Sequence, residues 1–407
     1  MRILYLSQYY SPEFGAAAAR ARSMSRWLAR FGHEVTVVTA LPNYLLETIP
    51  EPYRGKRWMQ EEMDGVQVYR AWLYTSSKRD NWRRMANYLS FMLSSWWHGR
   101  GLPGPFDVVI ASSPPLFLGL TGVALARRFR VPLVFDVRDM WPEIAVKQGI
   151  IKSGSLMERT WRAMADFTYD RSAAIVPVTT GIKQDMIARG LSPEKISLVH
   201  NGVDLEQIQE NAHDLRNELG LGEKFVALFA GLIGVMQEVS VIVNAALLLK
   251  DHPNIQFLIV GDGVERDKIA KRLQTLQLKS VTLLPRQPRE RMPHFLNTAD
   301  VCLATLSNAG ASDAVPLKML EGWAYRKPVI ITSSGVGAQL TTTWEAGLAT
   351  PPGDARALAN AILTLEADRA LLKRMGENGR RCIEEKLNRE ALARAMEQVL
   401  IGVTKQK

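Results

Sequence analysis

Short apolar runs alternate with amphipathic segments along most of the chain, a pattern typical of α/β proteins with parallel sheets. In the first half, strands are expected over residues 2–7, 33–39, 107–111, 131–135, 173–177 and 196–199. Helices are expected between them over residues 16–29, 85–97, 116–129 and 155–171. This alternation predicts a doubly wound sheet, in which ligands bind at the loops after the carboxyl ends of the strands.

A second series of the same kind follows in the other half of the chain. Strands are expected over residues 225–230, 255–260, 281–284, 300–304 and 328–332, and a helix over 318–325. Asn201-Gly202 indicates a sharp turn between the two series. Because 407 residues exceed what one core usually organises, we expect two Rossmann-like domains, 1–203 and 204–385. Residues 386–407 are expected to form a C-terminal helix that packs back on the first domain.

The composition is that of a folded protein, with 47% hydrophobic and 23% charged residues. Two cysteines, Cys302 and Cys382, are too few for a disulfide framework, which favours a reducing compartment such as the cytoplasm. No apolar run approaches the roughly 20 residues of a membrane-spanning helix, and Met1–Ser7 is too short for a signal peptide. The net charge of +10 favours anionic partners such as nucleotides, anionic lipids or nucleic acid.

Asp313 and Glu321 lie eight positions apart at the start of the helix expected over 318–325. Pro316 suits the first turn of that helix, where its missing N–H is harmless. The free N–H groups at a helix N-terminus favour a phosphate, Lys318 adds a cation, and a carboxylate beside them suits sugar or ribose hydroxyls. The alternative is that Asp313 is a surface N-cap and Glu321 an exposed helix residue.

Glycine-bearing loops follow the first strand of each series. Gly15 precedes the first helix, and Gly231 and Gly234 follow the strand over 225–230. Such glycines let the main chain approach a phosphate, although a plain tight turn explains each of them equally well. The first loop lacks Gly-x-Gly-x-x-Gly, which disfavours a dinucleotide site.

A charged and aromatic cluster, residues 136–143, is expected directly after the strand over 131–135 and includes Arg138 and Asp139. Loops at this edge of an α/β sheet are where ligand-binding residues gather. A capped and salt-bridged loop is the alternative, since Asp ahead of a helix that starts with proline is also good capping chemistry.

Residues 78–100 combine cations with an apolar helix expected over 85–97. This helix is too short to span a bilayer, but flanking cations and aromatic residues suit a helix lying in the headgroup layer. A core helix with an exposed basic start is the alternative. The expected cations are Lys78, Arg79, Arg83 and Arg84, and the expected lipid-facing residues are Leu89, Phe91, Leu93, Trp96 and Trp97.

In their order along the chain these motifs resemble the retaining glycosyltransferases of family 4, and the resemblance covers nearly the whole chain. It rests on the Gly15 loop, Arg138-Asp139-Met140-Trp141-Pro142, Asn201-Gly202-Val203-Asp204, the loop after 225–230 and Asp313-x7-Glu321. Bacterial surface-polysaccharide enzymes, including the N-acetyl-L-fucosamine transferases, are the most similar members. The resemblance implies the GT-B fold, two Rossmann-like domains that face a cleft.

For the second domain, the resemblance implies that Glu321 binds the ribose of a nucleotide donor and that Asp313 binds the hydroxyls of its sugar. Lys318 and the main chain around Leu317 are implied to face the diphosphate. Asp313 stands where the family usually has glutamate.

For the first domain, the resemblance implies that Gly15 touches the diphosphate and that Asp139, with Arg138 nearby, lies at the reacting sugar. Many relatives have histidine at the position of Asp139. A further departure removes a cation, because Gln237-Glu238 stands where many members have Lys-Gly in the phosphate loop. Arg286 or Arg289 could replace that cation, unless each is an ordinary exposed loop arginine.

The resemblance also implies retention of anomeric configuration by front-face attack, without a protein nucleophile. Six histidines and two cysteines offer no Ser-His-Asp, Cys-His or metal-ligand arrangement, so we expect a metal-independent enzyme without a cofactor. The expected donor is a UDP-sugar, such as one carrying an N-acetylated amino-deoxyhexose. The expected acceptor is a polyprenyl-diphosphate-linked saccharide in O-antigen, capsule or lipopolysaccharide synthesis, used on the inner face of the cell membrane.

Two other functions compete with this expectation. A nucleotide-sugar epimerase with the GT-B fold would need no membrane-facing helix. A nucleic-acid binder would suit the net charge, but the cations lack the aromatic stacking platforms and recognition motifs of such proteins, so no nucleic-acid partner is expected.

Overall fold

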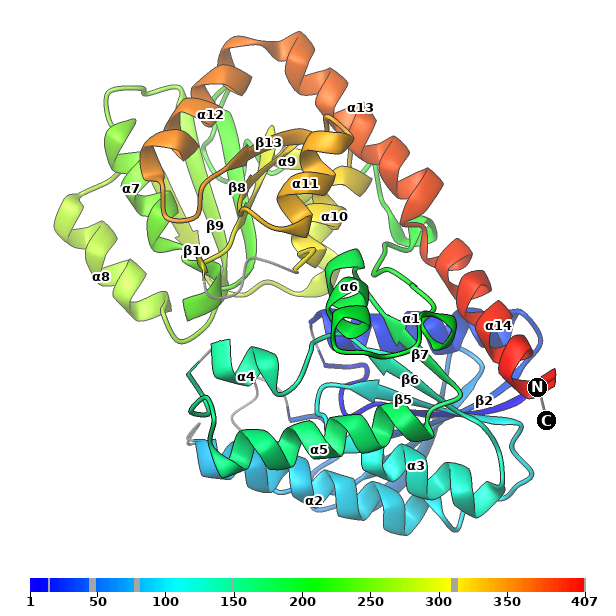
Figure 1. The fold of residues 1–407 in the computed structure, drawn as a ribbon. Helices are drawn as coiled ribbons and strands as arrows, with labels where there is room; N and C mark the ends of the chain where they lie inside the picture. Colours follow the sequence, from blue (N-terminus) through cyan, green and yellow to red (C-terminus); the bar gives the residue numbers. More distant parts are fainter. Residues whose placement is uncertain (14, 44–48, 77–80, 148, 309–313, 406–407) are drawn as a thin grey trace. The chain divides into compact units, whose positions relative to one another are not determined.

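The structure is a computed structural model that describes residues 1–13, 15–43, 49–76, 81–147, 149–308 and 314–405. The chain forms two compact units (Figure 1). The first consists of Met1–Asn201 together with Arg389–Lys407, and the second of Gly202–Asn388. The division therefore falls at the Asn201-Gly202 turn, and the last helix of the chain belongs to the first unit.

The first unit is built on a seven-stranded sheet with the order β3-β4-β2-β1-β5-β6-β7. Its strands are β1 (Arg2–Leu6), β2 (Glu34–Ala40), β3 (Trp58–Met63), β4 (Val66–Ala71), β5 (Val108–Ser113), β6 (Leu133–Val137) and β7 (Ala174–Pro177). All neighbours are parallel except β3 and β4. The strand expected over 196–199 is wrong, because only an isolated bridge between Ile175 and Ile196 forms there.

The β3–β4 hairpin is an element that the sequence analysis missed. Its turn is Asp64-Gly65, and both residues have positive φ, 54° and 77°. Asp-Gly between two short strands is a strong hairpin signal, because a type I′ turn needs positive φ at both central positions. The signal was therefore present in the sequence.

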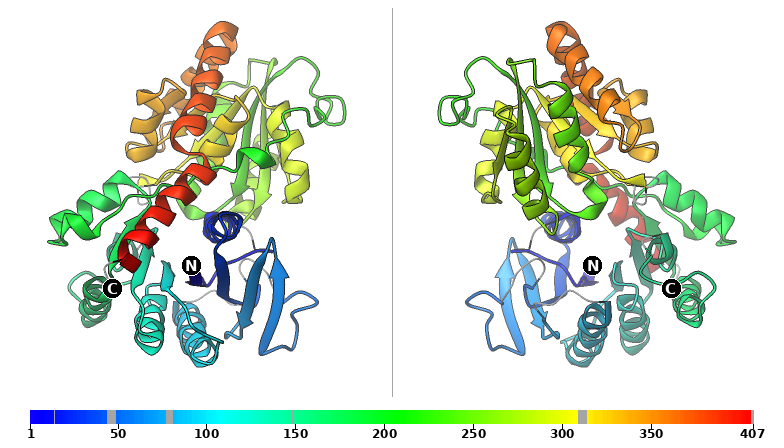
Figure 2. Two further views of the ribbon diagram at one scale, coloured as in Figure 1. Left: turned by 90° about the vertical axis from the view of Figure 1, so that its right-hand side faces the viewer. Right: turned by 90° about the vertical axis from the view of Figure 1, so that its left-hand side faces the viewer.

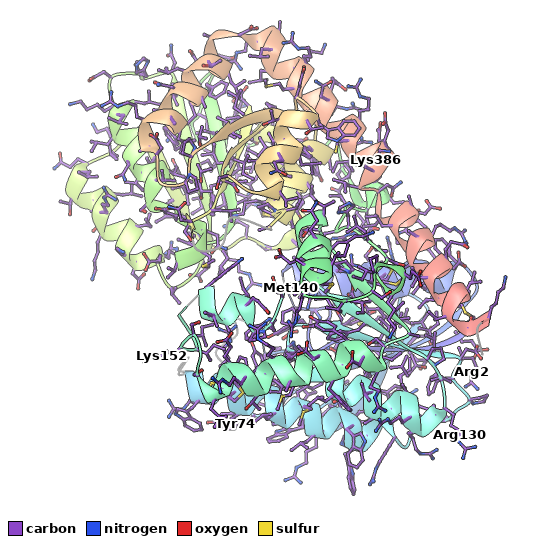
Figure 3. The ribbon with its side chains drawn as sticks, in the orientation of Figure 1. Arg2, Tyr74, Arg130, Met140, Lys152 and Lys386 are labelled. Carbon is purple, nitrogen blue, oxygen red and sulfur yellow. The ribbon has the colours of Figure 1, made fainter. Side chains whose placement is uncertain are left out.

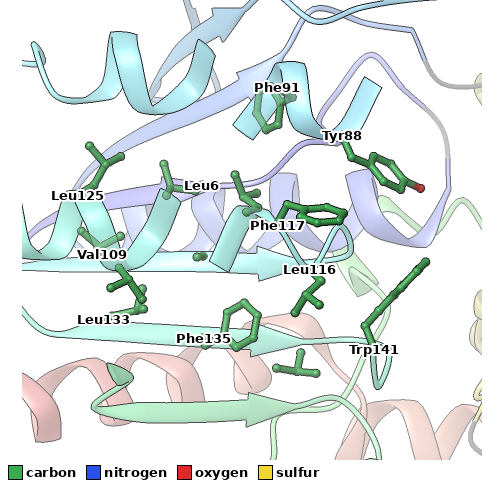
Figure 4. Close-up of a cluster of buried hydrophobic side chains, with 14 of the residues drawn as sticks. Leu6, Tyr88, Phe91, Val109, Leu116, Phe117, Leu125, Leu133, Phe135 and Trp141 are labelled. Carbon is green, nitrogen blue, oxygen red and sulfur yellow. The ribbon is translucent and has the colours of Figure 1, made fainter. Parts of the chain in front are cut away.

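Helices cover both faces of this sheet (Figure 2). Their bounds are α1 (Ala16–Arg30), α2 (Asn81–Gly99), α3 (Leu118–Phe129), α4 (Glu143–Lys147), α5 (Leu156–Arg171), α6 (Thr180–Ala188) and α14 (Arg389–Lys405). One apolar core lies between the sheet and α2, α3 and α5, and Figure 4 shows part of it. A second core joins the other face to α1 and α14, where Met24 and Trp27 share a cluster with Met396 and Leu400.

The second unit has a six-stranded, fully parallel sheet with the order β10-β9-β8-β11-β12-β13. The strands are β8 (Phe225–Leu232), β9 (Ile255–Asp262), β10 (Val281–Leu284), β11 (Val301–Thr305), β12 (Val329–Thr332) and β13 (Gly347–Thr350). The helices are α7 (Ser240–Leu248), α8 (Arg266–Leu276), α9 (Met292–Thr298), α10 (Leu317–Ala324), α11 (Val336–Thr343), α12 (Ala355–Ala367) and α13 (Arg369–Lys386). Separate apolar clusters lie on its two faces.

Strand order changes direction at the first strand of each sheet. In the first unit β1 lies between β2 and β5, and in the second β8 lies between β9 and β11. The carboxyl edge beside such a switch point is where open α/β sheets bind ligands. The loops after β1 and β8 are therefore the places to look for a site in each unit.

Candidate functional site

In the second unit, the loop after β8 passes close to the first turn of α10. Gly231 has a φ of 144°, and a Cβ built there would lie 3.4 Å from both Cε and Nζ of Lys318. The two predicted donor-site residues are thus neighbours, although 87 positions separate them in the sequence. A side chain at position 231 would fill the space beside the lysine ammonium.

The ammonium of Lys318 is buried and has no hydrogen-bond partner among the described residues. It lies 3.6 Å from the centroid of the Phe229 ring, which is a cation–π contact. Burial lowers the pKa of Lys318 to about 7, and the negative charge of Glu321 acts in the opposite direction. A buried cation of this kind is costly unless an anion accompanies it, so this position suits an anionic ligand.

The first turn of α10 adds main-chain donors to this ammonium. Pro316 is the N-cap residue, and Leu317 and Lys318 are the first two helical residues. The first N–H groups of a helix have no acceptor within it, and together with the helix dipole they favour an anion. Glu321, one turn further on, is partly buried. Asp313 lies outside the described residues, so the prediction for it stays a prediction.

A second pair of glycines, which the sequence analysis did not single out, supports the Gly231 loop. A Cβ at Gly261 would lie 1.8 Å from the Gly231 carbonyl oxygen, and one at Gly263 would lie 2.4 Å from that of Ile233. Any side chain at either position would displace the loop. Gly-Asp-Gly at the end of a strand was the available signal, because glycine there indicates close approach of another backbone segment.

Gly234 and the residues after it form a short turn, η3 (Val235–Gln237). Gly234 is its N-cap, and the Thr305 hydroxyl donates to the Gln237 carbonyl oxygen. Glu238, which stands where many family members have glycine, has a φ of 42°. That is the left-handed region that favours glycine, so Glu238 holds a backbone conformation that a side chain adopts with strain.

The two arginines considered as substitutes for the missing cation have different surroundings. Arg286 follows β10 and is partly buried. Burial lowers its pKa, while the nearby Asp262 carboxylate raises it. The Arg289 guanidinium instead donates to the Gln207 side chain at 3.1 Å. Arg286 therefore lies beside the loop after β9, next to the β8 loop in the sheet order, and is the better placed of the two.

In the first unit, Gly15 is the N-cap residue of α1, with a φ of 110° that favours glycine. The Arg138 guanidinium donates to the carbonyl oxygens of Ser113 at 3.1 Å and Pro114 at 3.2 Å. Its hydrogen bonds thus hold the end of β5. Asp139 is partly buried, and burial raises the pKa of its carboxyl while the Arg138 charge lowers it.

Asp136 does not belong to the loop cluster in which the sequence analysis placed it. It lies inside β6 and is fully buried, and its Oδ1 is 2.8 Å from Nη2 of Arg20 in α1. The Ser112 hydroxyl donates to its other oxygen at 2.9 Å. Arg20 also donates to the His200 carbonyl oxygen at 2.8 Å. The Arg20–Asp136 ion pair therefore fixes α1 to the sheet, and the bond from Arg20 to His200 fixes the start of the Asn201-Gly202 turn. The Asp136 carboxylate can lie inside β6, past its apolar run, because Arg20 compensates the charge.

Helix α2 has apolar residues on both sides. Phe91 was expected to face lipid, but it is fully buried in the core because it lies on the side that faces the sheet. Leu93 and Trp97 are 60% and 59% exposed. Leu89, Trp96 and, at the start of the helix, Trp82 are exposed as well. The core interpretation is thus right for one side of the helix, and an apolar stripe remains on the other.

The expected cations of this region are only partly described. Arg84 is exposed and donates to the Tyr88 hydroxyl at 2.9 Å, and Arg83 is partly buried over the Trp82 ring. Lys78 and Arg79 lie outside the described residues. None of the helices in the described part of the chain is long and apolar enough to cross a membrane.

Within the described ranges, no group of three or more His, Cys, Asp or Glu side chains is arranged to hold a metal ion. The expectation of a metal-independent enzyme stays a prediction. A hollow of about 420 Å³ is lined by Leu205 and residues 208–212. It contains none of the residues described above, so the chemistry of the candidate site does not depend on it.

Comparison with known proteins divides the chain into two domains near the same point as the structure, after residue 201. Residues 15–202 match the family described as Glycosyl transferase 4-like domain, and residues 211–382 match Glycosyl transferases group 1. A protein of Escherichia coli (strain K12) named as the colanic acid biosynthesis glycosyl transferase WcaI is 28% identical over 348 residues. This similarity covers 82% of the chain and 83% of WcaI.

Solved structures share the fold along the whole chain. Sucrose-phosphate synthase from Thermosynechococcus elongatus has a TM-score of 0.78 and 21% identity, with all of both chains covered. HepE from Anabaena in complex with UDP-glucose has a TM-score of 0.74 and 17% identity, covering 99% of this chain and all of HepE. At these identities the likeness shows the fold alone. The expected fold, two Rossmann-like domains of the GT-B class, is confirmed.

Proposed function

The chain is a glycosyltransferase with a glycosyl transferase 4-like domain followed by a group 1 domain, and from this premise we propose that its donor is a UDP-sugar bound by the second unit. The observation that carries the proposal is the buried Lys318 ammonium, which lies beside Gly231 and the first turn of α10 and has no hydrogen-bond partner in the part of the chain that the structure describes. HepE, a structural neighbour with the same fold, binds UDP-glucose.

In this proposal the diphosphate accepts hydrogen bonds from the Lys318 ammonium and from main-chain N–H groups at Leu317. Both groups are positioned before the donor arrives, so they stabilise the negative charge that grows on the leaving diphosphate as the sugar departs. Such preorganised electrostatic stabilisation is usually a large catalytic contribution. Arg286 is the proposed further cation, and Gly231 and Gly234 leave room for the phosphates.

Two carboxylates are proposed to bind hydroxyl groups of the donor. Glu321 accepts hydrogen bonds from the ribose, as the resemblance implies, and Asp313 is proposed for the donor sugar. In the first unit, Gly15 and Asp139 are proposed at the diphosphate and the reacting sugar. We propose retention of configuration, in which the leaving phosphate oxygen helps to remove the acceptor proton, so neither a protein nucleophile nor a metal ion is needed.

The acceptor is proposed to be a polyprenyl-diphosphate-linked saccharide in the synthesis of a surface polysaccharide such as an O-antigen or capsule. The name of WcaI, which refers to colanic acid biosynthesis, supports this class of product. The exposed apolar stripe of α2, with Arg84 near its start, suits contact with an anionic membrane surface. We therefore propose a peripheral enzyme on the inner face of the cell membrane, with an N-acetylated amino-deoxyhexose as the donor sugar.

Calorimetric titration with UDP tests the donor site. Lys318→Met keeps the length of the side chain but removes its charge, and UDP affinity is expected to fall about tenfold or more, because a charge-assisted hydrogen bond contributes roughly 1.5–3 kcal/mol. Lys327→Met is the matched control, since this lysine of the same unit is also partly buried and donates to the Asn297 carbonyl oxygen at 3.0 Å. Equal UDP affinity in wild type and folded Lys318→Met would sink the assignment.

Transfer from a panel of radiolabelled UDP-sugars to a membrane lipid extract tests the reaction. Label that enters the lipid fraction supports glycosyl transfer. Conversion of the UDP-sugar to its epimer without transfer would instead support the epimerase.

A further inference from the structure

The first unit has its own unsatisfied group at the switch point of its sheet. Gln8 lies two positions after the end of β1, the strand that separates β2 from β5. Its exposed fraction is 0%, yet its side-chain oxygen Oε1 has no hydrogen-bond partner within the ranges that the structure describes. Buried amide oxygens are nearly always paired, so an unpaired one at a ligand-binding edge requires an explanation.

The hydrogen-bond network shows which end of the Gln8 amide is unpaired. Asn87 Nδ2 donates to the Tyr74 carbonyl oxygen at 2.7 Å. Because a carbonyl oxygen accepts only, that end of the Asn87 amide is nitrogen and the other end is oxygen. Gln8 Nε2 donates to this Asn87 Oδ1 at 2.8 Å. The unpaired atom of Gln8 is therefore its acceptor oxygen, and exchanging the two ends of the amide would break the contact with Asn87.

The surrounding residues hold Gln8 firmly. Its own carbonyl oxygen accepts from the Ala40 N–H at 3.3 Å and from the Thr39 hydroxyl at 3.2 Å. Tyr74, labelled near α2 in Figure 3, is fixed by the Ser90 hydroxyl, which accepts from the Tyr74 N–H at 2.7 Å. These bonds fix the Gln8 main chain and the Tyr74 segment, and the bond from Nε2 to Asn87 holds the side-chain amide, so its oxygen is preorganised for a ligand.

Trp141, at the same edge, has an unpaired hydrogen-bond donor, whereas Gln8 has an unpaired acceptor. It follows β6, is only 6% exposed, and its indole N–H has no hydrogen-bond partner from any described residue. Figure 4 shows Trp141 and Tyr88 at the end toward which the strand arrows point. Its ring packs against Trp161, with centroids 5.5 Å apart. Gln8 and Trp141 thus place an unpaired buried acceptor and an unpaired buried donor at this edge, and Glu143 Oε2, two positions after Trp141, is a further acceptor without a partner among the described residues.

The two groups follow strands that a single strand separates. In the sheet β5 lies between β1 and β6, and at about 4.8 Å per strand the ends of β1 and β6 are about 10 Å apart. At the end of β5, the carbonyl oxygens of Ser113 and Pro114 are already bonded to Arg138. A ligand that contacts the ends of both β1 and β6 therefore meets the Gln8 amide oxygen at the first and the Trp141 indole N–H at the second.

The chemistry of the pair selects the ligand class. An ionised phosphate only accepts hydrogen bonds, so it cannot satisfy the Gln8 oxygen. A hydroxyl both donates and accepts, so a sugar satisfies both groups, and both are uncharged. We propose that Gln8 and Trp141 bind the acceptor sugar: Gln8 Oε1 accepts from one of its hydroxyls and the Trp141 N–H donates to one of its oxygens. This inference rests on the proposed transfer reaction and names the acceptor-binding residues within it.

Saturation-transfer NMR of the full chain in the presence of UDP tests the inference. The probes are the methyl α-glycosides of glucose, galactose, fucose, N-acetylglucosamine and N-acetylgalactosamine. Gln8→Met and Trp141→Phe keep most of the side-chain volume and remove the polar group. Each is expected to lower the glycoside signal at least threefold, while the Kd for UDP stays within twofold of wild type.

Two controls separate recognition from packing. Trp161→Phe makes the same change in the ring that packs against Trp141, and Thr39→Val removes the hydroxyl that supports the Gln8 main chain. Both are expected to keep the glycoside signal. If the thermal unfolding curve shows that Gln8→Met does not fold, the glycoside signals of Trp141→Phe and of its control Trp161→Phe test the proposal.

The proposal is overturned if wild type saturates none of the five glycosides, if the folded variants keep the wild-type signal, or if the controls lose as much as the variants. A crystal structure with a bound glycoside in which Gln8 Oε1 bonds only to a buried water would also overturn it. If UDP does not bind wild type, the proposed donor site is wrong. The glycoside signal then still tests the acceptor-binding residues separately.

Discussion

Both sheets change strand order at their first strand, but the buried groups left without partners at their carboxyl edges differ in charge. Among the described residues of the second unit these groups include a cation, the Lys318 ammonium beside the N-terminus of α10, together with the neutral Thr350 hydroxyl at the end of β13. Among those of the first unit they are the neutral Gln8 oxygen and Trp141 N–H and one oxygen of the Glu143 carboxylate, and none of these three is a cation. The same topology therefore prepares one edge for an anion and the other for hydroxyls. In a glycosyltransferase these are the needs of a nucleotide diphosphate and of an acceptor sugar.

The largest expected effect concerns the anion-binding edge of the second unit. Glu321→Ala is predicted to weaken UDP binding about 100-fold or more, because two charge-assisted hydrogen bonds to ribose are lost, each contributing roughly 1.5–3 kcal/mol. Titration calorimetry measures the change. Glu377→Ala, which removes an exposed carboxylate paired with Arg326, is the control and should bind UDP normally. Unchanged affinity in folded Glu321→Ala would show that the ribose role is wrong.

Asp139→Asn tests whether the first unit serves the reaction without holding the nucleotide. Turnover is predicted to fall about 10- to 100-fold while the Kd for UDP stays nearly constant, since the residue is proposed at the reacting sugar and an effect confined to kcat marks a transition-state interaction. Steady-state kinetics and UDP titration are compared on the same sample. Equal losses in both would move Asp139 into the donor site, and wild-type turnover would make it a structural loop residue.

The charge on Lys318 predicts a pH dependence that the hydroxyl-binding edge should lack. Burial lowers its pKa to about 7, so the free enzyme loses the cation as pH rises through 7, and UDP binding should weaken about tenfold between pH 6 and pH 8.5. For the free protein the sign is opposite. A lysine whose folded pKa lies below its unfolded value makes the free energy of unfolding rise with pH between those two values.

The control for this prediction is Lys318→Arg, whose guanidinium stays charged throughout the range. Its UDP affinity should be nearly independent of pH once the small change measured with Lys318→Met is subtracted. A wild-type profile as flat as that of the arginine variant would contradict a buried, partly neutral lysine.

The smallest expected effect concerns the outer side of α2, which only the first unit carries. Changing Leu93 and Trp97 to Gln is predicted to lower sedimentation with anionic liposomes a few-fold, because exposed apolar side chains would no longer enter the headgroup boundary. Val235→Gln with Val264→Gln, at 66% and 65% exposed positions of the second unit, is the matched control.

Changing Lys78, Arg79, Arg83 and Arg84 to Gln should reduce the same binding, and salt should weaken it without abolishing it, since each cation contributes about 1 kcal/mol near an anionic surface. Transfer to a short water-soluble acceptor should be spared. Equal losses with short and long-chain acceptors would return α2 to a purely structural role.

Much of the fold was predictable because it depends on local pattern. Apolar runs between amphipathic segments located β1, β2 and five of the six strands of the second sheet to within a few residues, but β13 (Gly347–Thr350) was not predicted. Asn201-Gly202 marked the division of the chain. The strand expected over 196–199 was wrong: Ser197 and Val199 donate to carbonyl oxygens of β7, but the segment forms only one isolated bridge, Ile175–Ile196, and no regular strand. The Asp64-Gly65 hairpin carried a local signal that was overlooked.

Residue type and spacing also pointed to Gly231, Lys318 and Glu321, since glycine in a loop and a cation at a helix start have local meaning. Only the tertiary structure brought Gly231 beside Lys318, joined Asp136 to Arg20 across 116 positions and turned Phe91 inward. It alone showed which buried atoms stay unpaired, as at Gln8 and Trp141. A hydrogen bond is satisfied by partners that are distant in the sequence, so no local pattern can report its absence.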